Sequence, residues 1–366
     1  MLPLATERPG ARRDDVGPVG RRLRWGLGTG IALLVSTVIG ASLVQIPYLA
    51  YAPGSATPLG RQVTVRGATA YLPEHPVAFT TVRAGRATVL EALTGWLDDQ
   101  VDVVPVQAAN GDRSDAEARR YNAQLMDTSK LTAIAVALRR LGHTVTIRTT
   151  GSVVRQIAPD TPAAKDLRLD DVIVAVDGEL LDEPDRLGTL LQPGGPGASH
   201  TLTVERPAGS SRRIEVELET VAAPADPTRA VVGIAELEDR FVDFDLPFDV
   251  DIDTGDVGGP SAGLAFTLAV LDALTPGELT GGHRIAVTGT IALDGTVGPV
   301  GGGAQKAFGV RDAGYEVFLV PPAELAEVTD AVGERVRVIA VASLDEALAA
   351  IDSVGGDVAP LRPAAG

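Results

Sequence analysis

One stretch, residues 256–306, constrains the fold more than any other part of the chain. It opens with Asp-Val-Gly-Gly-Pro-Ser, and the apolar run Ala262–Leu274 has no glycine or proline after Gly263. Such a run is typical of a buried helix. Ser261 is therefore predicted to lie at a loop-to-helix junction, where free backbone N–H groups and the positive helix end can stabilise an oxyanion. The backbone of Ser261, Ala262 and Gly263 is the candidate oxyanion site.

Lys306 closes the same stretch, just after a second glycine run and at the start of an amphipathic segment that reaches Asp312. A cation near a helix N-terminus is disfavoured, so the pKa of this lysine is predicted to fall toward that of a usable base. A serine beside such a lysine forms a nucleophile–base dyad. The chain has only two other lysines, Lys130 and Lys165, so lysine is not its routine surface cation.

Three sequence blocks resemble the proteolytic domain of the Lon family of serine proteases. They occur in the family's order, with 45 residues between serine and lysine, and read Gly259-Pro260-Ser261-Ala262-Gly263, Thr288-Gly289-Thr290-Ile291-Ala292-Leu293-Asp294-Gly295 and Val297-Gly298-Pro299-Val300-Gly301-Gly302 before Lys306. The resemblance implies that Ser261 is the nucleophile, that Lys306 is its base and that Thr288 supports the lysine. The family often has an aspartate three residues before the serine, where this chain has Gly258.

The order of elements after residue 230 predicts an α/β proteolytic domain over residues 231–352, because strand-like and helical segments alternate. The expected strands are Val231–Ala235, Pro247–Ile252, Ile285–Thr288, Val317–Val320 and Val336–Val341. The expected helices are Ala262–Leu274, Lys306–Asp312, Ala323–Ala331 and Leu344–Ile351.

Residues 143–221 alternate as strands do around one helix, and they resemble a PDZ domain of the type found in bacterial proteases. The matching segments are Val153–Ala164, Leu169–Gly178, a helix at Asp185–Leu191 and closing strands at Thr201–Arg206 and Ile214–Leu218. The family usually has Gly-Asp where this chain has Asp170-Asp171. A PDZ groove binds an extended peptide as an added strand. With a preceding helix at residues 127–141, capped by Asp127-Thr128-Ser129, this domain is predicted to span residues 127–221.

The N-terminal region predicts a single-pass membrane protein. Residues 1–24 are rich in proline, glycine and arginine and are expected to be a disordered cytoplasmic tail. Residues 25–46 carry no charge and are long enough for one transmembrane helix. Six arginines precede this run and the next basic residue is Arg61, so the catalytic domain is expected outside the cytoplasm. The alternative is a cleaved signal peptide with Ala50-Tyr51-Ala52 as its cleavage site.

Three further segments are expected to contribute no chemistry. Residues 47–126 contain short β-like runs and a helical stretch at Ala87–Leu97, and are predicted to form an N-terminal packing region. Residues 222–230 are a predicted linker. Residues 353–366, small and proline-rich, are a predicted disordered tail.

Composition narrows the function further. The net charge of −16 argues against nucleic-acid binding, and the absence of cysteine excludes disulfides and thiol chemistry. The sequence has no G-x-x-x-x-G-K-[ST] motif for ATP, although Lon proteases usually carry an ATPase module. Asp249, Asp251 and Asp253 superficially suggest a calcium loop, but Thr254 and Pro260 stand where an EF-hand needs glycine and an acid. No metal site and no cofactor is predicted.

Ser261 also fits the G-x-S-x-G nucleophile elbow, but only His283 follows it, 22 residues on, so an α/β-hydrolase triad is not expected. The prediction is a membrane-anchored serine endopeptidase that cleaves protein or peptide substrates outside the cytoplasmic membrane. By the resemblance, it assembles as a homo-oligomer. The alternative is a non-catalytic scaffold, in which the PDZ-like domain binds partners and the Lon-like domain is an inert oligomeriser.

Overall fold

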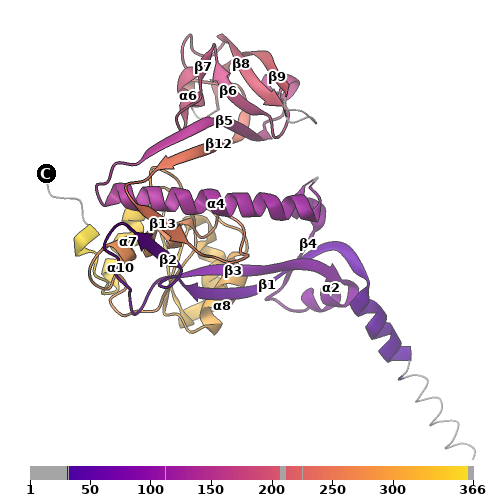
Figure 1. The fold of residues 1–366 in the computed structure, drawn as a ribbon. Helices are drawn as coiled ribbons and strands as arrows, with labels where there is room; N and C mark the ends of the chain where they lie inside the picture. Colours follow the sequence, from indigo (N-terminus) through magenta and orange to yellow (C-terminus); the bar gives the residue numbers. More distant parts are fainter. Residues whose placement is uncertain (1–30, 32, 112, 207–211, 225, 362–366) are drawn as a thin grey trace, which may run out of the picture. The chain divides into compact units, whose positions relative to one another are not determined.

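The computed structural model describes residues 31, 33–111, 113–206, 212–224 and 226–361 (Figure 1). The chain divides into two compact units, one of residues 1–54 and 82–115 and one of residues 55–81 and 116–366. Strands β1 (Gln45–Pro58) and β3 (Ala78–Thr88) have residues in both units. The predicted packing region of residues 47–126 is therefore not a body of its own.

In the first unit, β1 pairs antiparallel with β4 (Asp102–Pro105), so that Tyr48 lies opposite Pro105. Helix α2 (Val89–Gly95) follows β3 and begins with a capping box, in which Thr88 Oγ1 accepts from Glu91 N and the Glu91 carboxylate accepts from Thr88 N. Helix α3 (Val106–Asn110) follows β4. The helix predicted at residues 87–97 is confirmed in a shorter form.

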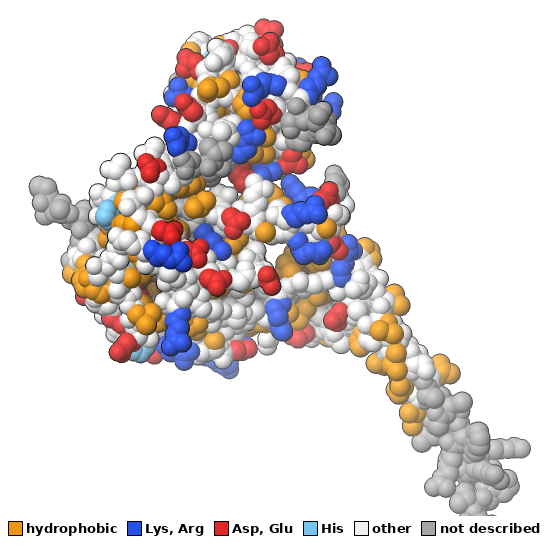
Figure 2. Space-filling view, in the orientation of Figure 1, with side chains coloured by type: hydrophobic (Ala, Val, Ile, Leu, Met, Phe, Trp, Pro, Cys, Tyr) orange, Lys and Arg blue, Asp and Glu red, His pale blue; other side chains and the backbone are white. Residues whose placement is uncertain are grey.

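The predicted membrane span is described only in part. Residues 33–43 are helical, but β1 begins at Gln45 and replaces the last residues of the span expected at 25–46. Residues 25–30 and 32 lie outside the described residues. Within the described ranges, no helix is both long and apolar enough to cross a membrane. The helical residues nevertheless expose their apolar side chains (Figure 2), and Leu33, Leu34 and Leu43 are 69%, 65% and 74% exposed.

A parallel sheet in the second unit carries the candidate site. β14 (Ile285–Val287) pairs with β3 on one side and with β17 (Val317–Val320) on the other, and β18 (Arg337–Ala340) continues the sheet beyond β17. Every side chain of β14 and β17 is buried, as expected for parallel strands covered on both faces.

Helices alternate with these strands. They are α7 (Gly263–Leu274), α8 (Gly303–Asp312), α9 (Leu325–Val332), which follows the short η1 (Pro322–Glu324) and precedes η2 (Gly333–Arg335), and α10 (Leu344–Ser353). The predicted α/β class and its order of strands and helices are confirmed. Because β3 comes from the N-terminal region, however, this domain draws on residues that precede the PDZ-like segment.

The aspartates of the rejected calcium loop lie on a strand. β13 (Asp249–Ile252) pairs antiparallel with β2 (Val63–Arg66), and its residues alternate between exposed Asp249 and Asp251 and buried Val250 and Ile252. This alternation is what a strand with one acidic face requires. The predicted strand is therefore confirmed.

Helix α4 (Asp115–Arg140) packs into the core of the proteolytic domain. Its residues Ala133–Leu138 are buried in the same hydrophobic cluster as Leu264 and Leu268 of α7. The sequence analysis began this helix at residue 127 and grouped it with the PDZ-like domain. The structure begins it twelve residues earlier, so the predicted N-cap residues lie in mid-helix, and its apolar face belongs to the proteolytic core.

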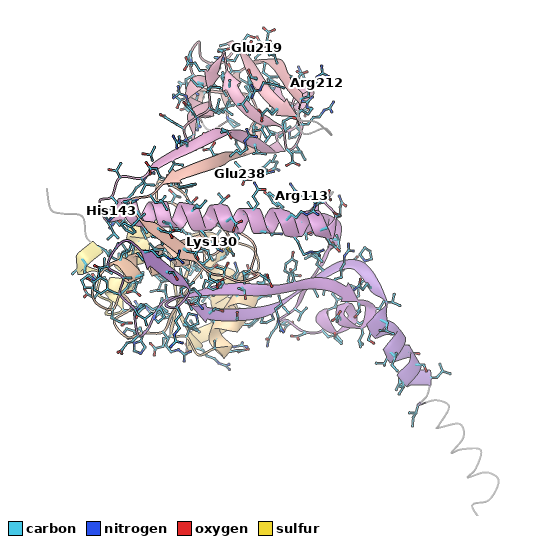
Figure 3. The ribbon with its side chains drawn as sticks, viewed as in Figure 1. Arg113, Lys130, His143, Arg212, Glu219 and Glu238 are labelled. Atoms are coloured by element: carbon cyan, nitrogen blue, oxygen red, sulfur yellow. The ribbon has the colours of Figure 1, made fainter. Side chains whose placement is uncertain are left out.

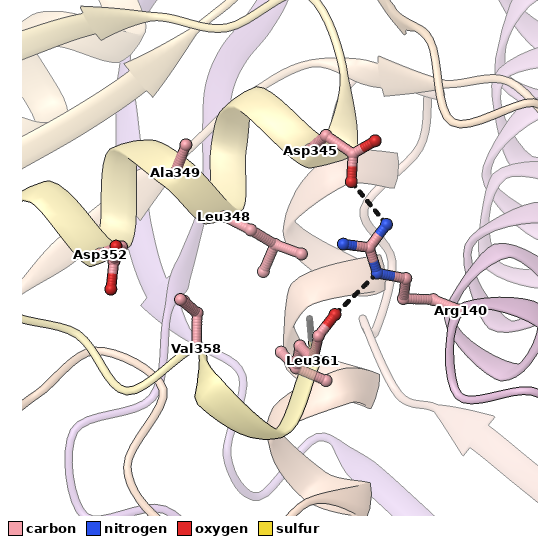
Figure 4. Close-up of a pocket in the computed structure, with 7 residues that line it drawn as sticks. All are labelled: Arg140, Asp345, Leu348, Ala349, Asp352, Val358 and Leu361. Carbon is pink, nitrogen blue, oxygen red and sulfur yellow. Dashed lines mark hydrogen bonds and ion pairs between the residues drawn. The ribbon is translucent and has the colours of Figure 1, made fainter. Parts of the chain in front are cut away.

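The end of α4 also fixes the C-terminal segment (Figure 4). Arg140 Nε donates to the carbonyl of Leu361 at 2.9 Å, and its guanidinium pairs with Asp345 of α10 at 2.5 Å. Leu361 ends the short helix η3 (Ala359–Leu361) and is 3% exposed. The tail predicted as disordered from residue 353 is thus ordered as far as residue 361, because it buries apolar side chains; residues 362–366 lie outside the described residues.

The PDZ-like domain is an antiparallel sheet with its own hydrophobic core. Its strand order is β12-β5-β6-β8-β9, with β7 paired to β6. The elements are β5 (Thr146–Ile157), α5 (Ala163–Asp166), β6 (Val172–Val176), β7 (Glu179–Leu180), α6 (Arg186–Leu190), β8 (Ser199–Arg206), β9 (Arg212–Glu219) and β12 (Ile234–Asp245). The helix and closing strands expected from the sequence are confirmed.

The unusual Asp170-Asp171 pair has a physical explanation. Asp170 adopts φ +65°, a left-handed conformation that glycine favours and aspartate tolerates. Asp171 is fully buried, and its two carboxylate oxygens accept from Arg206 Nε (2.8 Å) and Nη2 (2.6 Å). The buried carboxylate is therefore paired by a bidentate arginine, as burial of its charge requires.

The boundary between the two domains differs from the prediction. The expected linker, residues 222–230, contains β10 (Val221–Ala223) and β11 (Asp226–Val231), which pair antiparallel. The strand expected at Val231–Ala235 spans a break instead: Val231 ends β11, and β12 begins at Ile234 and pairs with β5 as far as Asp245. Backbone pairing thus assigns β12 to the PDZ-like sheet rather than to the proteolytic domain.

Candidate active site

Ser261 lies in a turn immediately before α7, as predicted. Two residues of α4 hold this turn: Asn122 O accepts from Gly259 N at 2.8 Å, and Ser129 Oγ donates to Pro260 O at 3.1 Å. Gly259 has φ +93°, which glycine adopts without the steric cost of a Cβ atom. The nucleophile loop is therefore positioned by a helix more than 130 residues away in sequence from Ser261.

Gly258 replaces the aspartate that is frequent in Lon proteases, and α4 explains why a small residue fits here. A Cβ atom at this position would lie 3.1 Å from Asn122 Cβ and 3.3 Å from the Asn122 carbonyl carbon. Such distances are tighter than ordinary van der Waals contact, so a side chain would displace the loop or the helix. The close approach of α4 thus leaves too little room for a side chain at position 258.

Lys306 and Thr288 form a buried hydrogen-bonded chain that leads to the nucleophile. Lys306 is 2% exposed, and its Nζ donates to Thr288 Oγ1 at 3.2 Å. Thr288 Oγ1 in turn donates to the carbonyl oxygen of Ser261 at 3.1 Å. Thr288 follows β14, and its N–H donates to Leu319 O of β17 at 3.0 Å, so the rigid sheet fixes it. The structure brings together the three residues that the sequence singled out.

The Ser261 hydroxyl forms no hydrogen bond to any residue in the described ranges, and Lys306 Nζ donates to Thr288 Oγ1 instead. Catalytic hydrogen bonds are often absent before substrate binds and form in the complex. A rotation of the Lys306 or Ser261 side chain is the movement that would complete the dyad.

Burial of Lys306 favours its neutral form, which is the form that can act as a base. It lowers the pKa of Lys306 from 10.5 to about 8, while the negative charge of Glu324 acts in the opposite direction. The direction agrees with the prediction, for which burial and the helix N-terminus are the two expected causes. Desolvation of the buried ammonium is the principal cause in the structure.

The backbone before α7 supplies candidate oxyanion donors. Gly263 N donates to Pro260 O at 3.3 Å and so is already engaged within the turn. Among the described residues, the N–H groups of Ser261 and Ala262 have no acceptor. Free N–H groups at a helix start are suited to binding an oxyanion. Ser261 and Ala262 are thus the better placed of the three predicted donors.

A cavity of about 390 Å³ adjoins the nucleophile loop. Leu125, Ser129 and Thr132 of α4 line it, together with Pro260 and with Thr290 and Ile291 of β15 (Thr290–Ile291), a strand that pairs with β16 (Val297–Gly298). The mixture of apolar side chains with hydroxyls is typical of sites that bind a side chain or peptide segment.

Asn122 and Ser129 were missed as site residues. The sequence carries no side-chain signal for Asn122, because its backbone carbonyl makes the contact, and Ser129 is one of several polar residues along α4. His283, the histidine of the rejected nucleophile-elbow alternative, pairs with Glu316 at 2.9 Å and is 42% exposed. It is engaged elsewhere, which agrees with the rejection of that alternative.

Serine, lysine and threonine on this α/β scaffold define the geometry of a serine–lysine hydrolase site. Residues 232–352 match the Lon protease (S16) C-terminal proteolytic domain, and residues 153–206 match the PDZ domain family. The chain thus contains a Lon-type proteolytic domain and a PDZ domain, and both predicted resemblances are confirmed.

Individual Lon proteases are similar to part of this chain. The Lon protease of Desulfatibacillum aliphaticivorans is 35% identical over 113 residues, which are 30% of this chain and 13% of the relative. That of Clostridioides difficile is 40% identical over 93 residues, or 25% of this chain and 12% of the relative. This chain therefore spans only about an eighth of the length of these relatives.

Among solved structures, the PDZ domain of an SdrC-like protein from Listeria monocytogenes has 20% sequence identity and a TM-score of 0.21, covering 24% of this chain and 86% of that one.

Proposed function

We propose that this chain is a membrane-anchored serine endopeptidase that cleaves protein substrates outside the cytoplasmic membrane. The observation that carries the proposal is the buried chain from Lys306 Nζ through Thr288 Oγ1 to the Ser261 carbonyl. In this chain a lysine of lowered pKa is joined through Thr288 to the backbone of a serine at a helix start, which supports activation of that serine as a nucleophile.

In the proposed reaction, neutral Lys306 takes the proton from Ser261 Oγ as the oxygen attacks the peptide carbonyl. The N–H groups of Ser261 and Ala262 donate to the resulting oxyanion. The Lys306 ammonium then protonates the leaving amine as the C–N bond breaks and the acyl-enzyme forms. Water, deprotonated by Lys306, hydrolyses the ester and restores the serine.

The other parts of the chain have supporting roles in this proposal. The PDZ domain selects substrates by binding an extended segment as an added strand. The cavity beside Pro260 receives substrate residues near the scissile bond. Assembly into a homo-oligomer follows from the resemblance to Lon proteases, and the proteolytic domain would supply the contacts.

We expect a serine-directed fluorophosphonate to label Ser261 covalently, because an activated hydroxyl attacks such an electrophile far faster than an ordinary serine does. Mass spectrometry should find the adduct on the Ser261 peptide, and Ser261→Ala should lose it. Ser199→Ala, which removes an exposed hydroxyl in the PDZ domain, is the matched control and should be labelled normally. A folded wild-type protein that resists labelling would favour the non-catalytic scaffold.

The exposed apolar helix near the N-terminus supports the membrane anchor. Its described apolar side chains are mostly exposed, and six arginines precede it in the sequence, whereas the next arginine after it is Arg61. We expect a C-terminal alkaline phosphatase fusion to be active in a bacterial host, because that reporter folds only outside the cytoplasm. A strong signal from a cytoplasm-only reporter at the same position, with none from the phosphatase, would contradict this topology.

A further inference from the structure

Glu324 is a buried carboxylate beside the loop that leads into the Lys306 helix. It ends η1 and is 6% exposed. One oxygen, Oε1, accepts from Val300 N at 2.8 Å, whereas Oε2 is buried and has no hydrogen-bond partner in the described ranges. A buried carboxylate oxygen without a partner is costly, so a nearby positive charge is needed to compensate.

Lys306 is a buried cation on a neighbouring helix, although no ion pair joins its ammonium to Glu324 directly. It lies one turn inside α8, which begins just after the loop that Glu324 holds, and α8 packs against α9, the helix that continues from η1. Glu324 is the charged group that raises the pKa of the buried Lys306 ammonium against the effect of burial. The hydrogen-bond partner of Nζ, Thr288 Oγ1, carries no charge.

Other charged groups on the neighbouring elements are engaged elsewhere or exposed. Glu327 Oε1 accepts from Ala304 N (2.9 Å), Arg311 of α8 pairs with Asp312 (2.8 Å), and Asp272 of α7 accepts from Leu279 N (3.0 Å). Asp330 of α9 is exposed, and Asp294, in the turn between β15 and β16, accepts from Thr296 N (2.8 Å). Strands β14, β15, β16 and β17 contain no charged residue. Asp272 is buried too and its Oδ2 has no hydrogen-bond partner in the described ranges, but Glu324 is the buried carboxylate whose charge acts on Lys306.

We propose that Glu324 is a positioning residue of the dyad, whose charge keeps Lys306 protonated in the resting protein and so restrains proton abstraction from Ser261 at neutral pH. The inference rests on the proposed Ser261–Lys306 dyad and extends it. An uncharged side chain of the same shape would retain the hydrogen bond to Val300 N. Without the negative charge, a larger fraction of Lys306 would be neutral and able to act as a base. The carboxylate thus lowers activity at neutral pH and moves the rise in activity to higher pH.

The test is Glu324→Gln in the full-length protein. The amide oxygen can still accept from Val300 N, so the fold is preserved while the charge is lost. We expect the midpoint on the acid side of the kcat/KM–pH profile to move down by roughly one pH unit or more. Turnover of a peptide substrate at pH 7 should rise several-fold, because a larger fraction of Lys306 is neutral.

Glu327→Gln is the matched control. It removes a carboxylate three residues further along the same segment, which holds Ala304 N rather than compensating the lysine, so the midpoint should stay at its wild-type value. Glu324→Asp keeps the charge and should return the midpoint toward wild type. If Glu324→Gln shifted the midpoint only through a folding defect, Glu324→Asp, which also alters this side chain, would not restore the wild-type midpoint.

Direct titration of Lys306 separates this inference from the proposed activity. The chain has three lysines, so a ¹³C-lysine NMR spectrum contains three side-chain signals, and Lys306→Arg identifies the one of interest. Lys130, on α4 (Figure 3), and Lys165 serve as internal references. The Lys306 signal should titrate at lower pH in Glu324→Gln than in wild type, whether or not the protein hydrolyses peptides.

Three outcomes are therefore distinct. A lower Lys306 midpoint in Glu324→Gln with no peptidase activity in any variant would preserve the charge coupling and refute the proposed function. An unchanged midpoint in both NMR and kinetics would overturn the role of Glu324. Equal shifts in Glu324→Gln and Glu327→Gln would also overturn it, because the effect would then come from overall negative charge.

Discussion

Replacing Lys306 by arginine is expected to lower peptidase turnover by roughly a hundredfold or more, the effect of losing a general base. The guanidinium retains a positive charge and similar reach, but it does not lose its proton in proteins. It therefore cannot accept the Ser261 proton, even where burial disfavours its charge. An arginine in this buried position would also lack an anionic partner other than Glu324.

The measurement is turnover of an unfolded protein substrate by wild type and Lys306→Arg, with circular dichroism to confirm that both are folded. Wild-type activity should rise with pH through about 8, since the base acts in its neutral form and its pKa is about 8. Lys165→Arg, on the PDZ domain, is the matched control and should have no effect. Near-wild-type turnover in a folded Lys306→Arg protein would refute the dyad.

The site could be predicted from the sequence because its chemistry depends on local signals. A serine at a helix start, a lysine after a glycine run and the Thr288 block each fix a backbone conformation within a few residues. The same is true of β14 and β17, which are short runs of apolar residues only, and of α7, which is largely apolar. Their order then allows only a few α/β arrangements.

The missed features depend on contacts between distant residues. Nothing within the segment around Asn122 and Ser129 indicates that α4 would hold the Ser261 loop, because that contact joins residues more than 130 positions apart. Similarly, β12 follows a stretch that resembles a linker, and only its pairing with β5 shows that it completes the PDZ sheet. Propensity cannot decide which of two neighbouring domains such a strand joins.

The burial of Glu324 could not be predicted from the sequence either. Its sequence context, after two prolines and before an amphipathic helix, is that of an ordinary surface residue. The side chain is instead buried, because η1 turns it toward the loop that precedes α8. A charged residue whose burial depends on a distant loop cannot be recognised from hydrophobic periodicity alone.

The close packing of α7 against β15 and α4 predicts a second large effect, from Gly263→Ala. In an unconstrained helix this change would raise the free energy of unfolding by about 1 kcal/mol, because alanine is the better helix former. Here the new Cβ would lie 2.9 Å from both Ile291 N and Ile291 Cγ2, and 3.0 Å from Ser129 Oγ. Ile291 N is backbone and cannot rotate away, so overpacking, which costs about 1–3 kcal/mol, should outweigh the gain in propensity.

Relief of that clash requires α7 to move away from β15 or α4, and Ser261 moves with it. Because misplacement of a reacting group by about 1 Å costs roughly a hundredfold in rate, we expect Gly263→Ala to lose most labelling of Ser261 and to unfold at a lower temperature. Gly301→Ala is the matched control: that glycine is exposed and a Cβ there would meet nothing within 4 Å. Fluorophosphonate labelling rates and thermal unfolding of both variants are the measurements. A Gly263→Ala protein with wild-type labelling and stability would show that the nucleophile loop does not depend on the contact between α7, β15 and α4.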